Sequence, residues 1–132
     1  MRHIFSDNFG NDFEKNDVEY LKELLSQPFS KLSFGSGDFA ISTNDQHRLV
    51  FFKLIEGIFI MYHPDYLAPK VHMQSFKILK HFVGGQEMEI PSSFLLNNHE
   101  AFVILSHYIQ TGNLHEKYQW TDFTEDIENY QS

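Results

Sequence analysis

Three kinds of residue in this chain could do chemistry: a serine between two glycines, eight histidines, and two carboxylates two positions apart. Gly35-Ser36-Gly37 lacks the G-x-S-x-G frame that activates a nucleophilic serine, so we interpret it as a flexible turn. It also lacks the lysine and the length of a phosphate-binding loop. Glu87 and Glu89 would share one face of a strand. Because no flanking Trp or Arg pattern indicates a shifted pKa, a solvated edge strand is favoured over an acid–base pair.

The histidines raise the question of a metal site. Zinc sites usually draw two ligands from closely spaced positions, such as histidines one helical turn apart. No two histidines in a predicted helix have that spacing. His99 and His107 would lie two turns apart, which is too far to share one ion. We therefore predict no metal, no cofactor and no catalytic residue.

The net charge of −8 is concentrated at the two ends of the chain. Residues 121–132 carry four acids and no base, and residues 1–23 carry six acids and three bases. Binding to phosphate requires clustered Lys and Arg, so this distribution disfavours a nucleic-acid partner and favours a basic protein. The competing interpretation is that the acidic ends only keep the protein in solution.

Composition indicates one globular domain, residues 1–132. The chain is 42% hydrophobic and contains 14 Phe and no Cys, which excludes disulfides, thiolate metal sites and a cysteine nucleophile. The start of the chain turns acidic before an apolar stretch develops, so we expect no signal peptide. The longest apolar run, residues 57–62, is far too short to span a membrane. We expect a cytoplasmic protein.

Two capping boxes predict the main helices. Asn16 with Glu19 opens a helix over Asp17–Ser26, and Asn97 with Glu100 opens another over Asn98–Thr111. Gly112 has the position of a C-terminal cap for the second helix. Its apolar positions converge on one face: Ala101, Phe102, Ile104, Leu105, Tyr108 and Ile109.

Extended runs occupy most of the remaining chain. Arg48–Ile55 and Ile58–His63 flank Glu56-Gly57 and predict a hairpin whose consecutive apolar residues indicate burial on both faces. We also expect extended segments at 31–34, 38–43, 87–91 and 118–120, and a loop between Pro64 and Pro69. Residues 71–83 fit a helix as well as a strand. The fold class is α+β, with a largely antiparallel sheet of about five to six strands and two main helices.

The segment from Glu87 to Trp120 resembles bacterial immunity proteins of polymorphic toxin systems, including those of contact-dependent growth inhibition. The resemblance lies in Glu89-Ile90-Pro91, in a helix that contains Ala101-Phe102 and closes with Tyr108 to Gly112, and in Gln119-Trp120. It implies a small cytoplasmic α/β protein that neutralises a toxin domain, often a nuclease, by direct binding. It assigns no binding residues. Pro91, Gly112 and Trp120 correspond to positions that maintain the fold.

Two functional hypotheses remain open at this level. The first is an immunity protein, not an enzyme, that masks the C-terminal domain of a cognate toxin as a monomer in a 1:1 complex. The candidate contacts are Asp122, Glu125, Asp126 and Glu128 in the acidic tail, with Tyr118 and Tyr66 as aromatic anchors. The second is a small-molecule-binding or enzymatic domain with a pocket that contains Tyr62, His63 or His72. The sequence does not determine the oligomeric state.

Overall fold

The chain combines short strands with helices, and the computed structural model describes residues 3–14, 18–32, 38–43, 46–71, 77–83 and 86–131. In chain order the elements are β1 (Ile4–Ser6), β2 (Asp12–Glu14), α1 (Val18–Leu25), α2 (Phe29–Leu32), β3 (Phe39–Ser42), β4 (Arg48–Lys53), β5 (Ile58–His63), β6 (Leu67–Lys70), β7 (Ile78–Val83), β8 (Gln86–Pro91), the 3-10 turn η1 (Ser92–Phe94), α3 (Asn98–Thr111), β9 (Gln119–Asp122) and α4 (Phe123–Gln131).

Seven strands form one sheet in the order β2-β1-β3-β4-β5-β6-β9, and β7 pairs with β8 in a separate two-stranded ladder. All of the described strand pairs are antiparallel. The α+β class and the largely antiparallel sheet are therefore confirmed, with one strand more in the main sheet than the sequence led us to expect.

The predicted hairpin is confirmed as β4 and β5, which pair from Arg48 opposite His63 to Lys53 opposite Ile58. β4 ends at Lys53 rather than Ile55, because the Leu54 N–H donates to the Gly57 carbonyl across the turn at 2.7 Å. The turn also lies against Leu95 and Leu96, in the segment that leads into α3. A Cβ on Gly57 would come within 3.0 Å of the Leu96 carbonyl oxygen.

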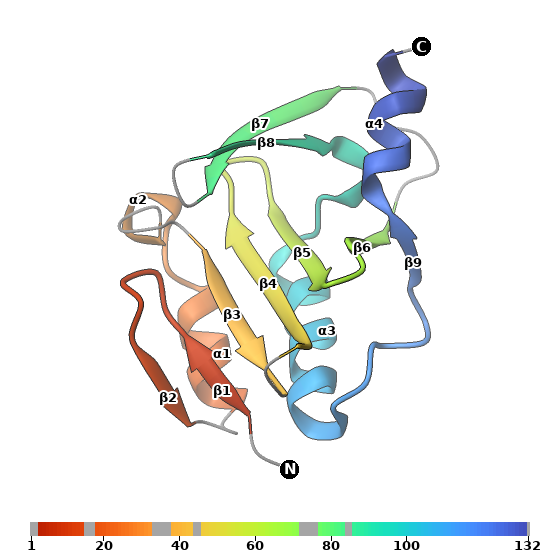
Figure 1. Cartoon of the computed structure of the whole chain (residues 1–132). Helices are drawn as coiled ribbons and strands as arrows, with labels where there is room; N and C mark the ends of the chain where they lie inside the picture. The colour runs from red at the N-terminus through yellow and green to blue at the C-terminus, as the bar shows by residue number, and fades with distance from the viewer. Residues whose placement is uncertain are drawn as a thin grey trace.

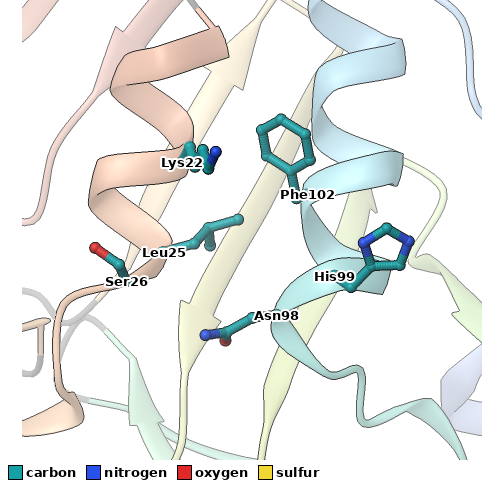
Figure 2. A pocket seen from close by; sticks show the side chains of 6 residues that line it. All are labelled: Lys22, Leu25, Ser26, Asn98, His99 and Phe102. Carbon is teal, nitrogen blue, oxygen red and sulfur yellow. The ribbon is translucent and has the colours of Figure 1, made fainter.

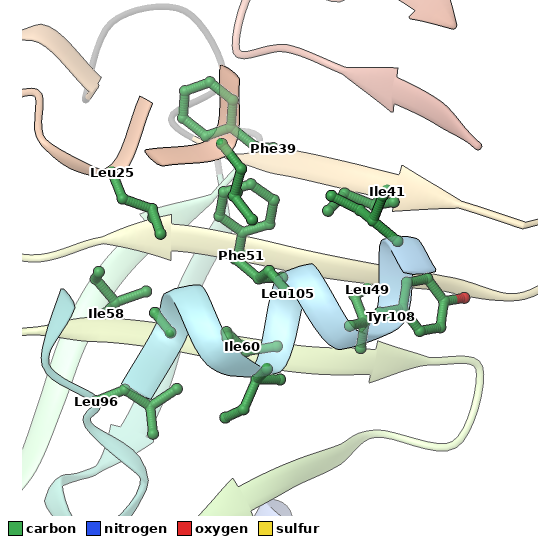
Figure 3. Packing of buried hydrophobic residues seen from close by; sticks show 14 of the residues in the cluster. Leu25, Phe39, Ile41, Leu49, Phe51, Ile58, Ile60, Leu96, Leu105 and Tyr108 are labelled. Carbon is green, nitrogen blue, oxygen red and sulfur yellow. The ribbon is translucent and has the colours of Figure 1, made fainter. Parts of the chain in front are cut away.

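Other elements pack against both faces of the main sheet. In Figure 1, α1 and α3 lie behind it, while β7, β8 and α4 lie in front of its upper part and right edge. Each face has its own hydrophobic cluster, and neighbouring residues of the central strands alternate between them. Phe51 and Ile60 pack in the cluster beneath α3 (Figure 3), and Phe52 and Phe59 pack in the opposite cluster. This alternation explains the uninterrupted apolar runs in β4 and β5.

Both predicted main helices are present and contact each other on one face of the sheet (Figure 2). Asn97 and Glu100 form the expected capping box of α3, with bonds of 2.8 and 3.0 Å, and Gly112 ends the helix in the left-handed conformation at φ 75°. The predicted cap of α1, Asn16, lies outside the described residues. At the other end of α1, the Lys53 ammonium donates to the carbonyls of Leu25 and Gln27.

Two expectations about extended segments and loops are wrong. Lys31 and Leu32 belong to the short helix α2 rather than to a strand, because their N–H groups donate back to the Pro28 carbonyl; residues 33–37 lie outside the described part. The stretch between Pro64 and Pro69 is not all loop, because Leu67–Lys70 is strand β6. Pro69 has no N–H to donate, and β6 pairs with β5 only at Leu67.

The ambiguous segment 71–83 is strand where it is described at its end, since Ile78–Val83 forms β7 against β8. Residues 72–76, which include His72, lie outside the described part. In the described part of the chain, no helix is long and apolar enough to cross a membrane.

Candidate protein-binding surface

The acidic C-terminal segment is a docked helix and not a free tail. Asp122 ends β9 and caps α4, because its Oδ1 accepts from the Thr124 N–H at 3.0 Å and from the Thr124 hydroxyl at 2.5 Å. Phe123, the first residue of the helix, is 3% exposed. Its ring meets Phe59 edge-on at 5.1 Å between centroids and Phe94 at 6.4 Å.

The faces of α4 are chemically distinct. Phe123 and Ile127, four residues apart, pack inward against the cluster around Phe52 and Phe59. Glu125 and Glu128, three residues apart, are exposed. The side chain of Asp126 lies outside the described part. The packed helix therefore presents Glu125 and Glu128 to the solvent, while Asp122, another predicted contact residue, has a structural role as the cap.

The two predicted aromatic anchors lie at opposite ends of the β6–β9 ladder. The ladder pairs Leu67 with Asp122 and Lys70 with Gln119, which places Tyr66 beside the start of α4 and Tyr118 at the far end. Five residues of extended chain separate these ends, or about 16 Å. The structure therefore brings Tyr66, but not Tyr118, next to the acidic helix.

The environments of these tyrosines differ. Tyr66 is 50% exposed in the β5–β6 turn, has a positive φ of 57°, and lies edge-on to His63. Tyr118 is half-buried against the cluster beneath α3. Burial, reinforced by the nearby Glu100 carboxylate, raises the pKa of Tyr118 above 10.0. Tyr66 is thus the more accessible of the two.

One histidine pair was not predicted from the sequence. His107 on α3 and His115 in the following loop lie 4.5 Å apart between ring centroids, because the chain reverses at Gly112. The Nδ1 of His115 accepts from the Lys117 N–H, and its backbone carbonyl accepts from the Trp120 indole N–H. Partial burial and the nearby His107 and Lys117 lower the pKa of His115 below 6.5. A glycine cap followed by a short loop was the available signal for this pair.

Among the described residues, no group of three or more His, Asp or Glu side chains is placed to hold a metal ion. His81 stacks on Phe52 at 4.7 Å, and burial lowers its pKa below 6.5. His63 contacts Tyr66 at a turn, and Tyr62 stacks on His47.

A hollow lies elsewhere, between α1 and α3 (Figure 2). Its volume is about 240 Å³, and it is lined by Lys22, Leu25, Ser26, Asn98, His99 and Phe102. A wider hollow of about 740 Å³ adjoins it at Asn98 and runs to the β4–β5 turn. Tyr62 and His63 line neither of them. The small-molecule hypothesis therefore gains no support from these residues and stays a prediction.

No model of a known protein family matches this chain, and no curated protein matches its sequence.

Proposed function

We propose that this protein binds the C-terminal toxin domain of a bacterial polymorphic toxin, of the kind used in contact-dependent growth inhibition, and neutralises it by covering its active site or substrate cleft. The toxin domain is a nuclease, and the complex contains one toxin domain per chain of this protein. The proposal rests on the resemblance in the segment from Glu87 to Trp120 and on the net charge of −8.

One structural observation carries the proposal. The acidic helix α4 is fixed by the buried ring of Phe123, while Glu125 and Glu128 are exposed. A nuclease needs a basic cleft to hold its phosphate substrate. Carboxylates on a helix that already packs against the core lose less conformational entropy on entering such a cleft than carboxylates on an unstructured tail.

The acids and the aromatic anchor have different roles in this proposal. Long-range attraction from the acids accelerates the association of the two proteins. Tyr66, half exposed beside the start of α4, supplies short-range contact area and slows dissociation. Tyr118 is farther away and more buried, so it contributes mainly by supporting β9.

The test is binding kinetics with the toxin domain encoded next to this protein, at low and at high salt. The variant neutralises the four predicted acids as Asp122→Asn, Glu125→Gln, Asp126→Asn and Glu128→Gln. Asn caps a helix about as well as Asp does, so α4 should keep its cap. The association rate should fall by at least about tenfold at low salt and depend less on salt.

The matched control neutralises four exposed acids outside the C-terminal segment: Glu19, Glu23, Glu56 and Glu116, each to Gln. It has the same net charge as the first variant, so it should retain a faster association rate. Equal rates for the two variants would mean that overall charge, and not α4, drives association. Failure of the wild-type protein to bind the toxin domain or to protect cells from it would refute the function itself.

A further inference from the structure

Among the described elements, only β7, β8 and α4 lie on the sheet face turned away from α1 and α3. In Figure 1, β7 and β8 cross its upper part, and no described element lies in front of the lower halves of β1, β3 and β4. The covered part is closely packed, since His81 stacks on Phe52 and Phe123 meets Phe59.

The strand register identifies the side chains on this side of the sheet, whose lower part is called the open face below. Residues directly opposite each other on neighbouring strands point to the same side of a sheet. Successive partners across five strands form a lower row of Glu14, Ile4, Ser42, Arg48 and His63, and an upper row of Asp12, Ser6, Ala40, Val50 and Met61. Their neighbours in sequence, such as Phe5, Ile41 and Leu49, pack toward the helices, so both rows point away from α1 and α3.

Small side chains occupy the middle of the open face, at Ser6, Ala40 and Ser42. Ile4 is 43% exposed, whereas Val50 in the upper row is only 8% exposed. A flat face of this kind lets another sheet approach to the usual packing distance of about 10 Å. Asp12 and Glu14 lie on the edge strand β2, where charged side chains discourage the pairing of a further strand. Contact through the face is therefore favoured over contact through the edge.

The charges of the lower row are self-complementary. Exposed Glu14 on β2 and exposed Arg48 on β4 are three strand spacings apart, or about 14 Å. We propose that this open face packs against the same face of a second copy of the chain, around a twofold axis that runs parallel to the strands between β1 and β3. Each Glu14 then faces the Arg48 of the other copy, whereas an axis across the strands would place like charges together.

The size of the face sets the strength of this dimer. Five strands span about 19 Å, and two rows of side chains bury less than the roughly 800 Å² per partner of a stable complex. The dimer should therefore be weak, in equilibrium with monomer at micromolar concentration, and weaker at high salt. It leaves α4, at the far edge of the sheet, exposed on both copies, so it does not depend on the function proposed above.

The experiment is sedimentation of the purified protein at low salt, from micromolar to near-millimolar concentration. The average mass should rise from 15.6 kDa toward twice that value. Arg48→Glu should keep the protein monomeric, and the double variant Arg48→Glu with Glu14→Arg, which restores opposite charges across the axis, should dimerise again. Lys22→Glu makes the same charge change on α1, behind the sheet, and should dimerise like the wild type.

A wild-type protein that stays monomeric throughout would overturn the proposal, and so would an Arg48→Glu variant that dimerises normally. A double variant that stays monomeric would show that the two residues do not face each other. If Arg48→Glu does not fold, as judged by circular dichroism, Ile4→Lys serves instead. It places a charge beside the axis and should abolish the dimer, whereas retained dimerisation would exclude this face.

Discussion

Replacing Phe123 with Ala tests whether the acidic C-terminal segment is part of the folded core. Phe123 is 3% exposed and is held between Phe59 and Phe94. It also occupies the first position of α4, directly after the cap Asp122. The substitution removes the inward anchor of the helix and leaves its acidic residues unchanged.

The expected loss of unfolding free energy follows from the area of the Phe123 ring that folding removes from water. Burying a Phe side chain removes roughly 200 Å², which at about 25 cal/mol per Å² is worth about 5 kcal/mol. An Ala side chain still buries part of this area, and the unfolded chain already buries some of it. Phe→Ala substitutions in cores cost about 3 to 5 kcal/mol, and we expect about 3 kcal/mol here because a site near the chain terminus can partly collapse.

The assay is urea unfolding, with hydrogen exchange of the α4 amides as a local readout. Glu125→Ala, on the exposed side of the same helix, should change the free energy of unfolding by less than about 0.5 kcal/mol. The Phe123→Ala variant should lose protection throughout α4. A loss below about 1 kcal/mol, with α4 protection intact, would refute the view that this ring fixes the helix.

Two further predictions concern local interactions. Asn97→Ala removes the acceptor for the Glu100 N–H and should lower the free energy of unfolding by about 1 kcal/mol, whereas Asn97→Ser should cost much less; urea unfolding of both variants checks this. Burial holds the pKa of His81 below its usual 6.5, so the unfolded chain binds more protons than the folded one as the pH falls. Stability should therefore fall from pH 6.5 downward until the folded-state pKa is passed. His81→Gln should show a shallower fall in unfolding curves recorded across that range, and an unchanged slope would contradict the assignment.

The sequence by itself determined the elements whose decisive contacts are local. The cap of α3 depends on Asn97 and Glu100, three residues apart, and its end depends on Gly112. The β4–β5 hairpin needs only the turn at Glu56-Gly57 and two apolar runs that are covered on both faces. Interactions over such short separations recur wherever the pattern occurs, so they can be predicted without knowledge of the rest of the fold.

Only the tertiary structure decided the elements whose partners are distant in sequence. Strand β6 exists because Leu67–Lys70 pairs with Gln119–Asp122, about fifty residues later. Without that pairing in view, Pro64 and Pro69 suggested a loop. The acidic residues suggested a tail, but the burial of Phe123 against Phe59 made that segment a docked helix. Similarly, His107 and His115 meet only because the chain reverses after α3. The open face with Glu14 and Arg48 depends on the order of the strands, which is set by packing across the whole sheet. The acidic character of the C-terminal segment, by contrast, was already evident in the sequence.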